Sequence, residues 1–267
     1  MDNRPILFLD SGIGGFPYCC DFLEKNRHES VFYLADHENY PYGPKEKEEL
    51  KVILLTLLEK ILEKLNPKII VLACNTATIS ALSSLRISYP QILFVGTVPA
   101  VKPAAAACNN GRVGVLGTKR TIDEINDMNS MEQLCEIHGI AAPELVDFIE
   151  VHFFDSGKAE KRAEARKYIE LFRKLKVDTL VLGCTHFLYM LEDFKSEAKN
   201  YFRIFDSLEG ITKRIEFLLD ENGNNLRTDE KTSPFYRFFL TGGNINVSVW
   251  EKLAESKGFN LTMFNEL

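Results

Sequence analysis

Short apolar runs alternate along this chain with longer segments in which apolar residues recur at the spacing of a helix. This alternation is typical of βα units stacked on a mostly parallel sheet, so the pattern predicts an α/β fold. Most of the runs are continuously apolar, as expected for parallel strands that are covered on both faces. The predicted strands are Ile6–Leu9, Val31–Leu34, Ile69–Ala73, Ile92–Val95, Arg112–Leu116, Leu145–Ile149, Thr179–Leu182, Arg203–Phe205 and Arg237–Leu240.

Two long segments have the periodicity of amphipathic helices. Lys45–Leu65 places five leucines and Ile61 on one face, and the Asn66–Pro67 pair that follows ends the helix. Lys158–Lys176 repeats this pattern more weakly, directly before the apolar run that begins at Thr179. The charged residues of both segments are expected to face solvent, and they need no functional explanation.

Two passages of the sequence resemble each other. Residues 68–80 and 178–190 each contain an apolar strand, a small residue, a cysteine and a threonine that opens the next segment. Cys74 and Cys184 therefore stand at the carboxyl ends of predicted strands, where open α/β sheets bind their ligands. The repetition predicts two similar α/β domains with an active-site cleft between them. Residues 1–97 with 208–267 form a discontinuous first domain, and residues 98–207 form the second.

Composition and charge narrow the classes of partner. The chain has 32 lysines and arginines against 38 aspartates and glutamates, a net charge of −6, and basic residues scattered over the predicted helices. Nucleic acid is therefore not expected as a partner. No apolar run approaches the length of a membrane span, and residues 1–12 lack the apolar core of a signal peptide. We expect a cytoplasmic protein without a membrane partner.

Six cysteines occur without a CxxC pair, so neither a disulfide framework nor a zinc site is expected. Cys19, Cys20, Cys108 and Cys135 fall among apolar residues of predicted helices, where packing accounts for them. No spacing of histidines supplies further metal ligands. The predicted site therefore uses no metal.

Residues 7–15, LFLDSGIGG, predict a strand followed by a glycine-rich turn. A dinucleotide site is one interpretation, and Asp36 after the second strand favours it. However, Pro17 stands where the third glycine of that motif belongs, and the carboxylate of Asp10 would repel a pyrophosphate. We therefore rank a nucleotide site below a site for a carboxylic acid, in which Ser11 and free N–H groups of the turn bind the carboxylate.

The cysteines in LACNTA and LGCTH are the most specific chemical signal. Each thiol lies at a strand-to-helix junction, where helix N-terminal N–H groups favour a thiolate and anionic ligands. A thiol in such surroundings suits a base that works near neutral pH. One cysteine there could be structural, but two in equivalent positions predict function. His186 lies two residues after Cys184, so its imidazole could promote the thiolate or take its proton.

These motifs resemble those of the glutamate racemases in the aspartate/glutamate racemase superfamily. DSGIGG, PYGPK, ACNTA, GVLGTKRT and VLGCTH occur in the family's order over nearly the full chain. The resemblance implies two α/β domains, a glutamate substrate, two catalytic cysteines and no cofactor. It also implies that the product, D-glutamate, supplies peptidoglycan for the bacterial cell wall and so bears on cell shape.

The resemblance also implies a role for individual residues. Cys74 corresponds to the thiol that exchanges the proton of D-glutamate, and Cys184 to the thiol that serves L-glutamate. Asp10 and His186 correspond to assisting acid/base groups, and Asp36 and Glu150 to further acidic residues near the site. The residues expected to contact the amino acid are Ser11, Pro41, Tyr42, Gly43, Asn75, Thr76, Thr118, Thr121 and Thr185.

Two alternatives remain open at this stage. An aspartate racemase or a related racemase of the same fold would carry similar motifs, and the residues that measure side-chain length are not identified by sequence. A non-catalytic amino-acid-binding protein could have kept the pocket, although both thiols, Asp10 and His186 argue against it. The oligomeric state is not determined by the sequence, and a homodimer is the assembly considered.

Overall fold

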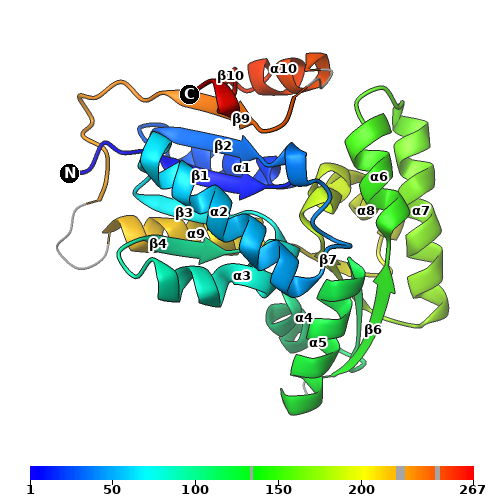
Figure 1. Ribbon diagram of the computed structural model, residues 1–267. Coiled ribbons are helices and arrows are strands. Elements are labelled where there is room, and N and C mark those ends of the chain that lie inside the picture. The colour runs from blue at the N-terminus through cyan, green and yellow to red at the C-terminus, as the bar shows by residue number, and fades with distance from the viewer. Residues whose placement is uncertain (133–134, 221–225, 244–246) are drawn as a thin grey trace. The chain divides into compact units, whose positions relative to one another are not determined.

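A computed structural model describes residues 1–132, 135–220, 226–243 and 247–267 of the chain. Its elements belong to two compact units (Figure 1). Unit 1 comprises Met1–Thr97 and Leu208–Leu267, and unit 2 comprises Val98–Ser207. No helix in the described ranges is long and apolar enough to cross a membrane.

Unit 1 is built on a six-stranded sheet in the order β10-β9-β2-β1-β3-β4, and all of its strand pairs are parallel (Figure 1). β1, β2 and β3 are entirely buried, as their continuous apolar character predicts. The strands are β1 Ile6–Asp10, β2 Val31–Ala35, β3 Ile69–Leu72, β4 Leu93–Gly96, β9 Tyr236–Leu240 and β10 Asn260–Met263.

Helices cover both faces of this sheet. On one face, Leu7 and Leu9 of β1 pack in a common core with Leu54 of α2 and Ala81 of α3. On the other face, the ring centroids of Phe8 and of Phe22 in α1 are 5.9 Å apart. The helices of unit 1 are α1 Phe16–Lys25, α2 Lys47–Leu65, α3 Asn75–Ser88, α9 Leu208–Asp220 and α10 Ser248–Glu255, with short 3-10 turns η1 His37–Asn39 and η4 Phe264–Glu266.

Unit 2 contains a four-stranded parallel sheet in the order β6-β5-β7-β8. Val113 and Val115 of β5 pack against Ala104 of α4 and Ile125 of α5. Phe172 of α7 lies against Gly114, where an added Cβ would come within 2.7 Å of the ring. The elements are α4 Val101–Ala107, β5 Arg112–Gly117, α5 Lys119–Glu132, β6 Glu136–Ala141, α6 Pro143–Asp147, η2 Phe148–His152, α7 Lys158–Lys174, β7 Thr179–Gly183, η3 Thr185–Met190, α8 Leu191–Ala198 and β8 Arg203–Phe205.

The predicted fold class, α/β with two mostly parallel sheets, is confirmed, but one predicted strand is wrong. Residues 145–149 are helical: they belong to α6 and to the π-helical turn η2. Pro143 begins α6, and Leu145 and Ile149 are both buried four residues apart, on one side of the helical segment. A short apolar run does not distinguish this arrangement from a strand.

Two strands were not predicted. β6 and β10 lie at the edges of their sheets and consist of exposed and partly buried residues, and neither has a continuous apolar run. Cys135, expected in a helix, directly precedes β6, and Cys108 follows the end of α4. Both thiols nevertheless pack against the core of unit 2, so the prediction of a packing role is compatible with their positions.

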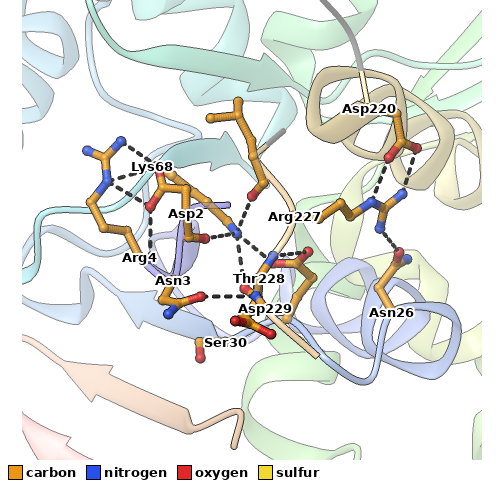
Figure 2. Close-up of polar contacts among 12 residues, drawn as sticks. Asp2, Asn3, Arg4, Asn26, Ser30, Lys68, Asp220, Arg227, Thr228 and Asp229 are labelled. Carbon is orange, nitrogen blue, oxygen red and sulfur yellow. Dashed lines mark hydrogen bonds and ion pairs between the residues drawn. The ribbon is translucent and has the colours of Figure 1, made fainter. Parts of the chain in front are cut away.

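A buried ion pair lies at the amino-terminal edge of the unit 1 sheet (Figure 2). Lys68, directly before β3, places its Nζ 2.7 Å from Glu29 Oε2, and the two side chains are 0% and 3% exposed. Lys68 also donates to the carbonyl oxygens of Asp2 and Leu226, each at 2.7 Å. Thr228 donates its hydroxyl to Glu29 at 2.8 Å.

This network joins the start of the chain, the start of β3 and the segment that leads into β9. Burial lowers the pKa of Lys68 despite the neighbouring carboxylate of Glu29. The cost of removing both charges from water is offset only while each has its partners. The Lys68–Glu29 pair is therefore expected to stabilise unit 1 by holding these three segments together.

Replacing Lys68 with methionine should lower the free energy of unfolding by about 3–5 kcal/mol, because Glu29 would remain buried without a cation. Chemical denaturation monitored by circular dichroism measures the loss. Lys25→Met is a suitable control, since it breaks an ion pair with Asp21 at 2.9 Å in which Lys25 is 45% exposed. That change should cost less than about 1 kcal/mol. Equal denaturation midpoints for Lys68→Met and the unchanged protein would contradict a stabilising role of the ion pair.

Candidate active site

The carboxyl ends of β1, β2 and β3 bring one group of predicted site residues together. Asp10 is the last residue of β1, and its carbonyl oxygen accepts a hydrogen bond from the N–H of Asp36 at 2.8 Å. On the other side, the N–H of Ala73 donates to Leu9 at 2.8 Å, which places Cys74 beside the same strand. The ladder thus continues past the strand ends and aligns an aspartate, a second aspartate and a thiol along one edge.

Asp10 is fully buried and holds its own turn in place. Its Oδ1 accepts the backbone N–H of Ser11 at 2.5 Å and that of Gly12 at 3.2 Å. These two N–H groups are therefore not free for a substrate carboxylate. Since the N–H groups of Ser11 and Gly12 already donate to the Asp10 carboxylate, they are not available to bind a phosphate. This argues against the nucleotide interpretation.

Gly15 in the same turn allows a close approach of two elements. A Cβ at this position would lie 2.6 Å from the Cβ of Ala73 and 3.1 Å from that of Asp10. No larger residue fits there without displacing the backbone that leads into Cys74. The glycine-rich motif thus serves packing beside the thiol.

Cys74 lies at the N-terminal end of α3, in extended backbone conformation with φ −139° and ψ 121°. Its side chain is partly buried, while Asn75 and Thr76, the first two residues of the helix, are buried. The positive end of the helix dipole favours a thiolate and a bound anion at this position. The local geometry therefore suits the predicted basic role.

Asp36 and Tyr42 form the polar part of the loop after β2. The Tyr42 hydroxyl donates to Asp36 Oδ2 at 2.6 Å, and both side chains are buried. Burial is the largest cause that raises the pKa of Tyr42 well above its ordinary value, followed by the charges of Asp36, Cys74 and Asp10. The phenol therefore stays protonated near neutral pH. Pro41 and Gly43 on either side of Tyr42 are partly exposed.

Cys184 occupies the corresponding position of unit 2. It follows β7 directly and has φ −131° and ψ 137°, nearly the backbone conformation of Cys74. Its Sγ lies 3.7 Å from His186 Nδ1, and His186 Nε2 lies 2.7 Å from Glu150 Oε1. The side chains of His186 and Glu150 are each 7% exposed. A thiol, an imidazole and a carboxylate thus form one buried chain of contacts.

The pKa of His186 reflects this arrangement. Burial, the largest effect, would lower it, but the contacts with Cys184 and Glu150 and the attraction of their negative charges raise it well above 6.5. Both contacts therefore favour the protonated form of the imidazole in the folded protein. A protonated imidazole beside the sulfur stabilises the thiolate form of a cysteine.

The predicted threonines of unit 2 lie at the same edge of its sheet. The hydroxyls of Thr118 and Thr121 are 3.0 Å apart, directly after β5, and Thr185 begins η3 beside Cys184. A Cβ at Gly183 would lie 3.7 Å from Thr121, so Thr121 is close to the backbone that leads into Cys184. Hydroxyl groups here could stabilise negative charge on a ligand.

The described side chains also bear on metal binding. Among them, no group of three or more His, Cys, Asp or Glu is arranged to hold a metal ion. None of the six cysteines, all within the described ranges, is joined in a disulfide. The side chains at the two strand edges are thiols, carboxylates, an imidazole and hydroxyls.

Comparison with known proteins identifies the family. Residues 23–210 match the model of the Asp/Glu/Hydantoin racemase family. A glutamate racemase of Bartonella henselae is 33% identical over 269 residues, which cover 98% of this chain and 97% of that protein. The chain belongs to the Asp/Glu/Hydantoin racemase family, and the resemblance read from its motifs is confirmed at this level.

Solved structures agree with this assignment. Glutamate racemase isoform RacE1 from Bacillus anthracis superposes with a TM-score of 0.80 at 28% identity, covering 98% of this chain and 97% of that one. Escherichia coli glutamate racemase, solved with L-glutamate and the activator UDP-MurNAc-ala, has a TM-score of 0.80 at 25% identity, with 97% of each chain covered. The prediction of an amino-acid racemase is thus supported by both sequence and fold.

Sequence reasoning missed two features of these groups. The direct contact between Glu150 and His186 was hidden because residues 145–149 were predicted as a strand. Thr241, directly after β9, donates to Asp36 at 2.8 Å, and only its place after an apolar run could have indicated it.

Replacing Glu150 with glutamine should lower the pKa of His186, because it removes the negative charge 2.7 Å from Nε2. Titration of ¹⁵N-labelled imidazoles by NMR measures the change. Glu136→Gln beside His138, at 3.1 Å with Glu136 56% exposed, is the matched control and should leave His186 unchanged.

The same pair predicts a pH dependence of stability. Folding raises the pKa of His186, so the protonated imidazole contributes to the stability of the folded protein. This contribution is complete below about pH 6.5 and is lost as the pH rises through the pKa that His186 has in the folded protein. Denaturation midpoints of the unchanged protein and Glu150→Gln should therefore differ more at pH 6 than at pH 9. A larger difference at pH 9 would show that the imidazole is neutral in the folded protein.

Proposed function

We propose that this protein interconverts L-glutamate and D-glutamate without a cofactor, using Cys74 and Cys184 as a pair of acid/base thiols. One observation carries the proposal. Each unit holds a cysteine in nearly the same extended conformation at the carboxyl end of a buried strand. Cys184 contacts an imidazole, and Cys74 follows β3, which pairs with the strand that ends at Asp10. The named relatives are glutamate racemases, which supports glutamate as the substrate.

Racemisation removes the α-proton from one face of the amino acid and returns a proton to the opposite face. One thiolate takes the proton as base, the electron pair remains on the α-carbon, and the other thiol donates its proton to that carbon. Cys74 serves D-glutamate and Cys184 serves L-glutamate. The two units then act as two domains that each supply one of the groups, with residues 1–97 and 208–267 in the first and 98–207 in the second.

Other residues assist proton transfer at the thiols and stabilise the negative charge that develops on the substrate. Asp10 assists Cys74, and His186 with Glu150 assists Cys184, because each can accept or supply a proton on its own side. The hydroxyls of Thr76, Thr118, Thr121 and Thr185, with Ser11 and the amide of Asn75, stabilise the carboxylates and the carbanion as fixed dipoles. Pro41, Tyr42 and Gly43 supply backbone contacts to the amino acid.

This activity implies a cellular setting. D-Glutamate made in the cytoplasm would supply peptidoglycan, and no partner besides the amino acid is needed for the chemistry. The Escherichia coli relative was solved with L-glutamate bound, which supports a small-molecule substrate here. A homodimer is the assembly proposed, to be measured by light scattering.

Circular dichroism of L-glutamate incubated with the purified protein, with no added cofactor, tests the function directly. The signal should decay to zero as the enantiomers reach equal concentrations. L-Aspartate in a parallel sample should lose its signal far more slowly. Faster loss with aspartate would make this an aspartate racemase, and a constant signal with both amino acids would favour a non-catalytic binding protein.

The two thiols can be separated by substitution. Cys74→Ser and Cys184→Ser should each reduce racemisation by at least about a hundredfold, because a serine hydroxyl is a far weaker acid than a thiol. In deuterium oxide, Cys74→Ser should retain more α-proton exchange with L-glutamate, and Cys184→Ser more with D-glutamate. Proton NMR of the Cα–H signal measures both.

Cys20→Ser in α1 serves as the control for the loss of a thiol, and it should racemise glutamate at the rate of the unchanged protein. If both site variants lost exchange with the same enantiomer, a one-base mechanism would be required. Racemisation at the unchanged rate by either variant would exclude that thiol from the reaction.

A further inference from the structure

Thr241 connects the C-terminal part of unit 1 to the loop after β2. It follows β9 at the carboxyl edge of the sheet, is 2% exposed, and donates its hydroxyl to Asp36 Oδ1 at 2.8 Å. The same hydroxyl accepts the N–H of Glu38 at 3.0 Å, and the N–H of Thr241 donates to Ala35 at 3.0 Å. Three hydrogen bonds thus hold this residue to the exit of β2.

The carboxylate of Asp36 is surrounded by donors of the protein itself. Oδ1 accepts from Thr241 at 2.8 Å and from Asn39 at 3.1 Å, and Oδ2 accepts from Tyr42 at 2.6 Å and from Asn39 at 3.0 Å. With 1% of Asp36 exposed, these contacts use both oxygens within the protein. A carboxylate engaged in this way is suited to fixing its donors in place, and taking up a substrate proton would break one of these bonds.

Tyr42 is the donor that matters for the substrate. Its ring is 1% exposed and its hydroxyl makes the shortest contact with Asp36, so the side chain anchors the backbone from Pro41 to Gly43. This backbone is the segment that contacts the amino acid under the proposed function. If Asp36 became less well fixed, Tyr42 and the backbone that contacts the substrate would therefore be less well positioned.

We propose that Thr241 is a positioning residue of the racemase, which fixes Asp36 and thereby Tyr42 and the segment Pro41–Gly43, and that Asp36 is a structural acceptor that takes no proton from the substrate. The inference rests on the proposed function. Thr241 touches no reacting atom in this scheme and acts only through Asp36. Loss of its hydroxyl would remove one hydrogen bond from the buried carboxylate of Asp36 and one from the N–H of Glu38.

The test compares Thr241→Val, which has nearly the same shape but no hydroxyl, with Thr241→Ser, which keeps the hydroxyl. Thr241→Val should raise KM for both enantiomers about tenfold with a smaller change in kcat, and Thr241→Ser should restore most of the loss. A purely structural role would lower the folded fraction, which reduces kcat and leaves KM unchanged. That result would overturn the proposal.

Thr212→Val is the matched control. Thr212 is also 2% exposed and donates its hydroxyl to a carboxylate, Asp21 Oδ2, at 2.6 Å, but it lies in α9 and contacts α1. Its loss should leave KM at the value of the unchanged protein. An equal rise in KM for Thr212→Val would show that any lost buried hydroxyl has this effect, and the positioning role would be rejected.

Two further variants keep the test decisive if Thr241→Val does not fold. Asp36→Asn should raise KM with little change in kcat, whereas a proton-carrying Asp36 would lose kcat. In a Tyr42→Phe background, Thr241→Ala should add little to the rise in KM, because the hydrogen bond between Tyr42 and Asp36 is already lost. Additive effects in that background would contradict a path through Tyr42.

Failure of this inference differs from failure of the proposed function. If the unchanged protein does not racemise glutamate, the function itself is wrong. If it does, and Thr241→Val retains both constants, only the positioning role fails.

Discussion

The parallel hydrogen-bonding of the two sheets is the constraint on which the rest of the structure depends. Parallel strands end at a common edge, so the residues that follow different strands are brought together at that edge. Asp10, Asp36 and Cys74 come from three strands and meet at such an edge, because the backbone ladder continues past the last paired residues. Cys184 follows its strand in the same way in unit 2.

The two thiols share a backbone conformation but have different neighbours. The sulfur of Cys184 contacts an imidazole whose pKa is raised, against the effect of burial, by its contacts with that sulfur and with a buried glutamate. Cys74 instead lies at the start of a full α-helix, beside a strand that ends in a buried aspartate. Two equivalent positions in the fold are therefore supported by different chemistry.

Unit 1 also shows how a late segment of the chain is built into a site formed by early ones. The segment before β9 is tied to Lys68 and Glu29 at the amino-terminal edge of the sheet (Figure 2). The residue after β9, Thr241, is tied to Asp36 at the carboxyl edge. Buried polar contacts at both ends thus add to apolar packing in holding this strand in register beside β2.

The sequence by itself determined the fold class, most of the strands, the glycine-rich turn and the two cysteines. These features depend on local patterns, since a buried parallel strand needs a continuous apolar run and a strand-end residue is recognised by its position after that run. The family motifs then indicated the remaining residues. The same local patterns failed for residues 145–149, because a short apolar run fits a buried helical turn as well as a strand.

Only the tertiary structure decided which polar groups meet. Ser11 and Gly12 donate to Asp10 and so are not free for a ligand, Glu150 pairs with a histidine 36 residues away, and Thr241 reaches Asp36 across 205 residues. Each is a contact between side chains or turns whose partners are chosen by packing. Periodicity records which face of an element is buried, but it carries no information about the donor that a buried carboxylate finds there.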